Sequence, residues 1–98
     1  MRSAIKELIR KYEVNPKDVA NTYNLGVYYL DANQPRKAIE LFDKIVNSES
    51  EFIAEINFGL SLAYAVIDKE KGEKYLDTAL KIKPKLEDNF YMGTRKNY

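Results

Sequence analysis

The sequence predicts an all-α protein built from repeated pairs of helices. Gly26, Gly59 and Gly93 lie inside similar apolar segments, at steps of 33 and 34 residues. A second set of positions, out of phase with the glycines, recurs at steps of 34 residues: Ala4, Leu8 and Pro16, then Ala38, Phe42 and Ser50, then Gly72, Leu76 and Pro84. Two interleaved patterns with one shared period predict a repeat architecture, in which each unit is a helix–turn–helix pair.

Apolar residues at helical spacing define the first two helices. In Met1–Tyr12 they recur on one face with the period of a helix, and charged residues occupy the opposite face. Pro16–Asp31 is apolar all round, which is typical of a helix covered on more than one side. Asn15 is suited to cap this second helix, with Pro16 in its first turn.

The glycine of the second helix needs a structural reason, because a glycine in a helix interior costs about 1 kcal/mol relative to alanine. Gly26 recurs as Gly59 and Gly93 in the equivalent segments. The simplest reason is close approach of a neighbouring helix backbone at these positions.

Turn residues separate the remaining helices. Asn33 is suited to a left-handed helix end, and Pro35 to a first helical turn. The run Ser48-Glu49-Ser50-Glu51 offers a capping box, and no segment shows the alternation of a strand. The later helices are expected at Pro35–Asn47, Ser50–Ile67, Glu70–Ile82 and Lys85–Lys96.

Composition argues against several classes of function. The 98 residues include no cysteine and no histidine, which removes thiolate chemistry, the commonest general base and the commonest metal ligand. Carboxylates are scattered at salt-bridge spacing, such as Glu40 with Lys44, so we expect no catalysis and no metal or cofactor. A net charge of +1 argues against nucleic-acid and membrane partners. Neither an export signal nor a membrane span is visible, so we expect a cytoplasmic location.

The repeated motif resembles a known family. Tyr23-Asn24-Leu25-Gly26-x-x-Tyr29, followed by Ala38-x-x-x-Phe42 on a period of 34 residues, is similar to the tetratricopeptide repeat. The resemblance is close for residues 19–51 and looser for residues 52–85, and it extends over nearly the whole chain.

Three positions depart from the family pattern. Thr22, Glu55 and Asn89 stand where the family usually has a large aromatic side chain. The departures concern local packing and leave the implied architecture unchanged.

The resemblance implies a right-handed superhelical stack of antiparallel helix pairs, with about six helices. A single domain would contain a half unit at 1–15, full units at 16–50 and 51–84, and a capping helix at 85–98. Members of the family mostly bind peptide segments of other proteins in a concave groove, which the first helix of each pair lines. We therefore expect a protein-interaction module whose partner is another protein or a peptide.

The resemblance also implies which side chains line that groove. They are Tyr23, Asn24, Val27, Leu30, Ile53, Ile56, Asn57, Leu60, Tyr64 and Tyr91, with Ala20, Asp31, Ala63, Glu87, Phe90 and Thr94 at further groove positions. None of these is a lysine or arginine, which disfavours an RNA partner. Members that grip C-terminal carboxylates use basic side chains at places filled here by Tyr23, Glu87 and Tyr91, so that subtype is also disfavoured.

Some alternatives stay open. Ile53, Ile56 and Leu60 share a helical face, and such faces are more typical of packing between units than of a binding surface. Asn24 and Asn57 either hydrogen-bond within the fold or address the backbone of a ligand. A homo-oligomer formed through the half units at the two ends is the alternative to a binding module.

Overall fold

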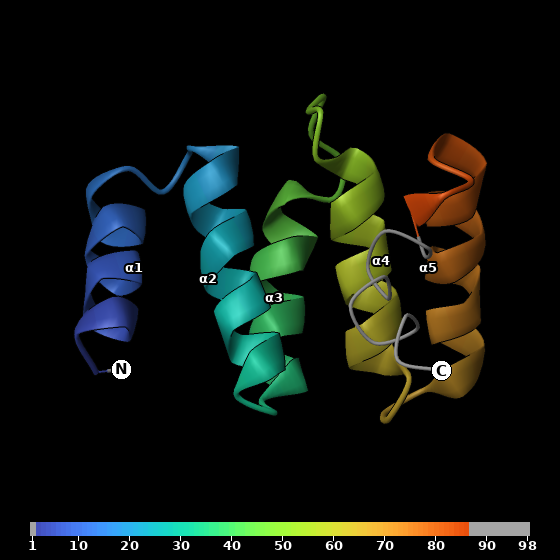
Figure 1. Ribbon diagram of the computed structural model, residues 1–98, viewed down its shortest axis with the longest axis horizontal. Helices are drawn as coiled ribbons and strands as arrows, with labels where there is room; N and C mark the ends of the chain where they lie inside the picture. Colours follow the sequence, from blue (N-terminus) through green and yellow to red (C-terminus); the bar gives the residue numbers. More distant parts are fainter. Residues whose placement is uncertain (1, 87–98) are drawn as a thin grey trace, which may run out of the picture.

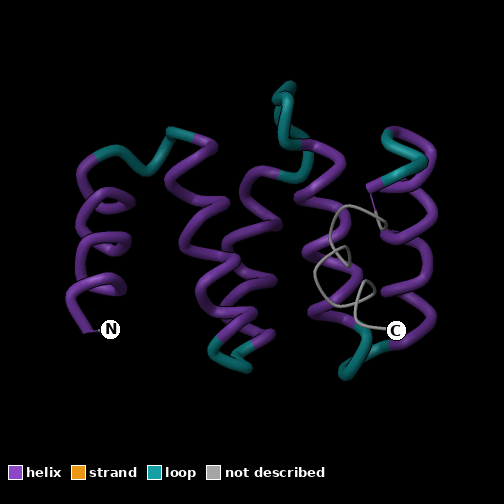
Figure 2. Tube along the Cα trace, in the orientation of Figure 1, coloured by secondary structure: helices purple, strands orange, loops and turns teal. Residues whose placement is uncertain are grey.

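The computed structural model describes residues 2–86, with side chains from Ala4 onward. Within this range the chain forms five helices and no strand (Figures 1 and 2), which confirms the prediction of an all-α protein. The helix expected at Lys85–Lys96 lies almost entirely outside the described residues. The five helices are α1 (Arg2–Val14), α2 (Val19–Asp31), α3 (Pro35–Ile45), α4 (Ile53–Tyr64) and α5 (Lys69–Ile82).

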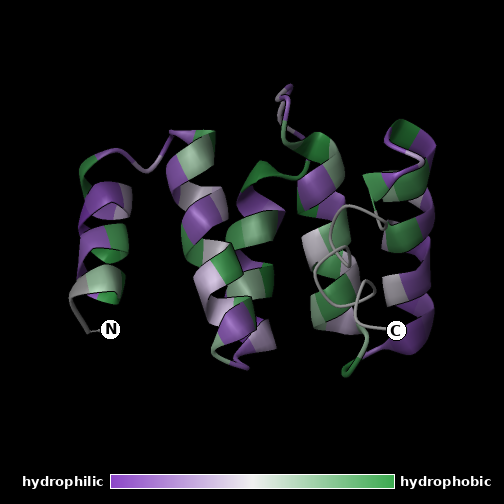
Figure 3. Ribbon diagram, in the orientation of Figure 1, coloured by the Kyte–Doolittle hydropathy of each residue, from purple (hydrophilic) through white to green (hydrophobic). Residues whose placement is uncertain are grey.

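Successive helices run in opposite directions and lie side by side (Figure 1). Each helix packs against the next, and α2 also contacts α4. Helices α2 and α4 therefore run parallel to each other, with α3 packed against both. Hydrophilic residues cover the side of α5 that faces away from α4, whereas α4 is largely hydrophobic (Figure 3).

Aspartates cap two of the helices. Asp18 Oδ1 accepts a hydrogen bond from the Asn21 N–H at 3.2 Å at the start of α2, and Asp68 Oδ1 accepts one from the Lys71 N–H at 3.3 Å at the start of α5. Such caps satisfy backbone donors that have no partner within the helix. The second helix begins later than predicted because Asp18, rather than Asn15, caps it.

The turn between α2 and α3 follows the prediction. Asn33 has a φ of 60°, the left-handed conformation expected of it. The Gln34 N–H donates to the Tyr29 carbonyl oxygen at 2.8 Å, which closes the end of α2 as a Schellman motif does. Pro35 lies in the first turn of α3, where its missing N–H costs nothing.

Helix α4 is shorter than the predicted Ser50–Ile67. Ser50 Oγ accepts a hydrogen bond from the Phe52 N–H at 3.0 Å inside the preceding turn. The helix then begins at Ile53 without a side-chain cap. The predicted capping box is therefore wrong, because Ser50 stabilises the turn rather than the helix end.

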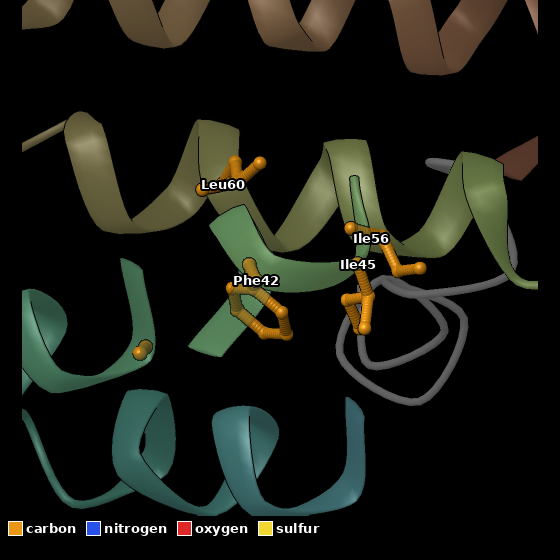
Figure 4. Packing of buried hydrophobic residues seen from close by; sticks show 5 residues of the cluster. Phe42, Ile45, Ile56 and Leu60 are labelled. Carbon is orange, nitrogen blue, oxygen red and sulfur yellow. The ribbon is translucent and has the colours of Figure 1, made fainter. Parts of the chain in front are cut away.

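The main core lies between α3 and α4. Phe42 and Ile45 on α3 and Ile56 and Leu60 on α4 form one buried cluster with Ala38 (Figure 4). Phe42, Ile56 and Leu60 have no exposed surface. Full burial of side chains of this size contributes about 1.5–3 kcal/mol each, so this cluster is a principal source of stability.

The Phe42 ring fills the space left by two glycines. A Cβ atom on Gly26 would lie 2.6 Å from Phe42 Cε1, and one on Gly59 would lie 2.9 Å from Phe42 Cε2. The close contact predicted at these glycines exists, but the neighbour is a phenyl ring and not a helix backbone. Because one ring touches both glycines, Gly26 and Gly59 lie at nearly the same level on α2 and α4.

A backbone contact of the predicted kind occurs at a different glycine. A Cβ atom on Gly72 would lie 3.0 Å from the Ser61 carbonyl oxygen and 3.3 Å from the Ala65 backbone nitrogen. Helix α5 therefore approaches the backbone of α4 closely at Gly72.

Replacing Gly26 by leucine should lower the free energy of unfolding by about 1–3 kcal/mol or more, because the buried Phe42 ring has no space to move into. Urea unfolding measures the change. Asn24→Leu, at an exposed position of the same helix, is the matched control and should stay within about 0.5 kcal/mol of the parent. Equal unfolding midpoints for Gly26→Leu and the parent would contradict the assignment of this contact.

Candidate functional site

A groove of about 300 Å³ lies between α2 and α4, and we call it the α2–α4 groove. The two parallel helices form its walls, and the turn between α2 and α3 contributes to one end. Its lining residues are Tyr23, Val27, Leu30, Asp31, Asn33, Pro35, Glu55, Gly59, Leu62 and Val66.

The packing of Phe42 holds the two helices of the groove together. The ring joins α2 and α4 from the α3 side, and Gly59, which contacts the ring, also lines the groove. Val27 of α2 and Leu62 of α4 provide apolar walls. Leu62 is 39% exposed and Val66 is 77% exposed, so the groove keeps apolar surface in contact with solvent.

Aromatic rings hold the end of the groove near the start of α4. Tyr23 stacks on Phe52 with ring centroids 5.6 Å apart, and it meets Phe42 at 6.1 Å. Burial raises the pKa of the Tyr23 hydroxyl, and the negative charge of Glu55 raises it further. The hydroxyl therefore keeps its proton well into the alkaline range and can donate as well as accept a hydrogen bond.

An ion pair lies at the same end of the groove. Lys83 Nζ donates to Glu55 Oε2 at 2.7 Å, which links the first turn of α4 to the residue after α5. Glu55 Oε1 is buried and has no hydrogen-bond partner among the described residues. One oxygen of this carboxylate is thus engaged, and the other retains its full capacity to accept.

The predicted groove residues lie in several different environments. Tyr23, Val27, Leu30 and Asp31 line the α2–α4 groove. Buried against neighbouring helices, with no exposed surface, are Ile56, Leu60 and Ala63. Outside the described residues are Tyr91, Glu87, Phe90 and Thr94.

Other predicted groove residues lie elsewhere. Tyr64 stacks on Tyr75 of α5 at 5.6 Å, and Lys71 Nζ lies 4.8 Å from the centre of the Tyr64 ring. Tyr64 therefore faces α5 and not the α2–α4 groove. Ile53 and Ala20 are half-buried and do not line the groove.

The two asparagines differ in their surroundings. Asn57 is only 5% exposed, and its Nδ2 donates to the Ile53 carbonyl oxygen at 2.8 Å. Asn24 is exposed to solvent. The local hydrogen bond explains Asn57 without a ligand, so the equivalence of the two positions in the repeat does not extend to their contacts.

Glu55, Leu62 and Val66 line the groove although the family register did not select them. With Gly59 they fall at i, i+4, i+7 and i+11, which is one face of a helix. The carried-over positions Ile53, Ile56 and Leu60 describe a neighbouring face. Helical spacing alone identifies these residues as one face of α4. The sequence does not show that this face lies toward α2, because the packing of Phe42 sets that orientation.

Asn57→Ala should lower the free energy of unfolding relative to Asn24→Ala by about 0.5–1.5 kcal/mol, the usual net contribution of one hydrogen bond. Both changes gain the same helix propensity, so the difference isolates the bond to Ile53. Chemical denaturation of the two variants supplies the measurement. Equal stabilities would mean that the buried amide contributes nothing to the fold.

The described residues contain neither a metal-binding cluster nor a membrane-spanning helix. Within residues 2–86, no three potential metal ligands among the acidic side chains gather closely enough to hold an ion. No helix in the same range is both long and apolar enough to cross a bilayer.

Comparison with known proteins adds no relative. No protein-family model matches the chain, and no curated protein and no solved structure matches it significantly.

Proposed function

We propose that this chain is a tetratricopeptide-like module that binds a segment of another protein in the α2–α4 groove, without catalysis. The proposed architecture is a right-handed superhelical stack of antiparallel helix pairs with about six helices. The observation that carries the proposal is the groove itself, which lies between the two helices that correspond to each other in the repeat.

The dimensions of the groove support a peptide side-chain site. Its volume of about 300 Å³ lies at the lower end of the range of about 300–1,000 Å³ typical of ligand pockets. Such a space accommodates a few side chains rather than a whole cofactor. Leu62 and Val66 expose apolar surface that a partner's side chains would remove from water.

The chemistry of the lining supports binding rather than catalysis. The polar side chains among the described lining residues are Tyr23, Asp31, Asn33 and Glu55. Glu55 is held by Lys83, and the raised pKa of Tyr23 keeps that hydroxyl protonated. A protonated phenol and an ion-paired carboxylate orient a bound segment well, but they provide no activated nucleophile.

Removing the exposed apolar contacts should weaken binding without unfolding the protein. We expect the Leu62→Asn, Val66→Asn double variant to lose about tenfold or more in affinity, since each side chain loses part of the 1.5–3 kcal/mol that full burial provides. Val14 is 73% exposed and does not line the groove, so Val14→Asn is the matched control and should bind normally.

The measurement uses short peptides selected on the full chain from a displayed random library and then titrated by calorimetry. Thermal unfolding of each variant should stay close to that of the parent, because surface changes of this kind are nearly neutral. If the double variant and the Val14→Asn control bind the selected peptides equally well, the binding site lies outside this groove.

A further inference from the structure

The two ends of the α2–α4 groove each carry a carboxylate. Glu55 lies in the first turn of α4, and Asp31 is the last residue of α2. Both line the groove, and none of its described lining residues is a lysine or arginine. Between them the walls are mainly apolar, so the groove has a carboxylate at each end, that of Glu55 paired with Lys83, and a hydrophobic middle.

The Phe42 contact sets the distance between these ends. Gly26 and Gly59 touch the same ring, so they share one level on the parallel helices. Glu55 precedes Gly59 by four residues and Asp31 follows Gly26 by five. Nine helical residues at about 1.5 Å each separate the backbone positions of Asp31 and Glu55 by roughly 13 Å along the groove.

That distance corresponds to a short stretch of extended chain. An extended backbone advances about 3.3–3.6 Å per residue, so about four residues span it. A helix advances only about 1.5 Å per residue, so about nine residues would be needed, more than a groove of about 300 Å³ accommodates.

The existing partner of Glu55 shows what its carboxylate accepts. Lys83 of this chain donates to Oε2, whereas the buried Oε1 has no partner in the described residues. The Lys83 side chain is 49% exposed, and an ion pair with such an exposed member contributes little. Because Oε1 is buried, a cation brought by a ligand would pair with Glu55 at Oε2, in the place of Lys83.

We propose that the α2–α4 groove selects an extended apolar segment of a partner protein that carries a basic side chain at each end, about four residues apart. This inference rests on the proposed function and names the chemistry of the partner. One cation pairs with Asp31 and the other with Glu55, while the apolar residues between them cover Leu62 and Val66.

Electrostatics disfavours acidic and neutral segments of the same shape. An acidic segment would bring like charges next to Asp31 and Glu55, which is unfavourable at short range. A fully neutral segment would cover Asp31 without pairing it, and burying an unpaired charge is costly. A segment with two basic side chains avoids both penalties.

The test uses the same selected peptides, resynthesised with each lysine or arginine replaced by norleucine. We expect each replacement to weaken binding by about threefold to tenfold, the effect of a partly exposed charge pair, and to reduce its dependence on salt. Asp31→Asn and Glu55→Gln should weaken the parent peptide to a similar extent. In each of these two protein variants, norleucine at the peptide position that pairs with the changed acid should leave the affinity nearly unchanged. Asp77→Asn, an exposed acid outside the groove, is the matched control.

Lys83→Gln provides an independent variant with the opposite sign. It removes the internal competitor for Glu55, so the basic peptides should bind several-fold more tightly. A purely structural role of the ion pair would instead give weaker or unchanged binding, and that result would overturn the role assigned to Glu55.

Two outcomes separate this inference from the proposed function. If peptides bind in a manner sensitive to Leu62→Asn and Val66→Asn but tolerate norleucine, the charge preference is overturned and the groove remains a binding site. If no selected peptide responds to the groove variants, both the charge preference and the proposed function are overturned.

Discussion

A single phenyl ring holds the centre of this protein together. Phe42 of α3 has no exposed surface, and its ring lies against Gly26 of α2 on one edge and Gly59 of α4 on the other. Any side chain at either glycine would occupy space that the ring already fills. The contact therefore explains why a glycine recurs in two helices where it lowers helix propensity by about 1 kcal/mol.

The same contact connects the fold to the candidate site. It fixes the relative level of α2 and α4, and Gly59, one of the two glycines at the ring, also lines the groove between its apolar walls. The positions of Asp31 and Glu55 along the groove follow from that level. The packing of Phe42 and the positions of Asp31 and Glu55 in the groove thus follow from one arrangement of helices.

The sequence predicted the parts of the structure that depend on local patterns. Apolar spacing located all five described helices, and Asn33 and Pro35 marked the turn between α2 and α3 correctly. The predicted start of α4 was wrong because Ser50 accepts a hydrogen bond from Phe52 within the preceding turn, and propensity alone does not choose between a turn and a helix cap. The groove was predicted only in part, because which face of a helix turns toward a partner depends on tertiary contacts such as that of Phe42. The pair between Glu55 and Lys83 joins residues 28 positions apart, a separation at which sequence spacing carries no information about contact.

A double-mutant cycle between Gly26→Ala and Phe42→Leu tests the central contact most directly. In the parent, the added methyl group meets the Phe42 ring and should destabilise the fold by overpacking. With leucine at position 42, the methyl group gains room, and Gly26→Ala should become neutral or stabilise the helix by up to about 1 kcal/mol. Urea unfolding of the four proteins should therefore give a coupling free energy of about 1–3 kcal/mol. Additive effects, with a coupling below about 0.5 kcal/mol, would show that the ring and the glycine are independent and would contradict this account.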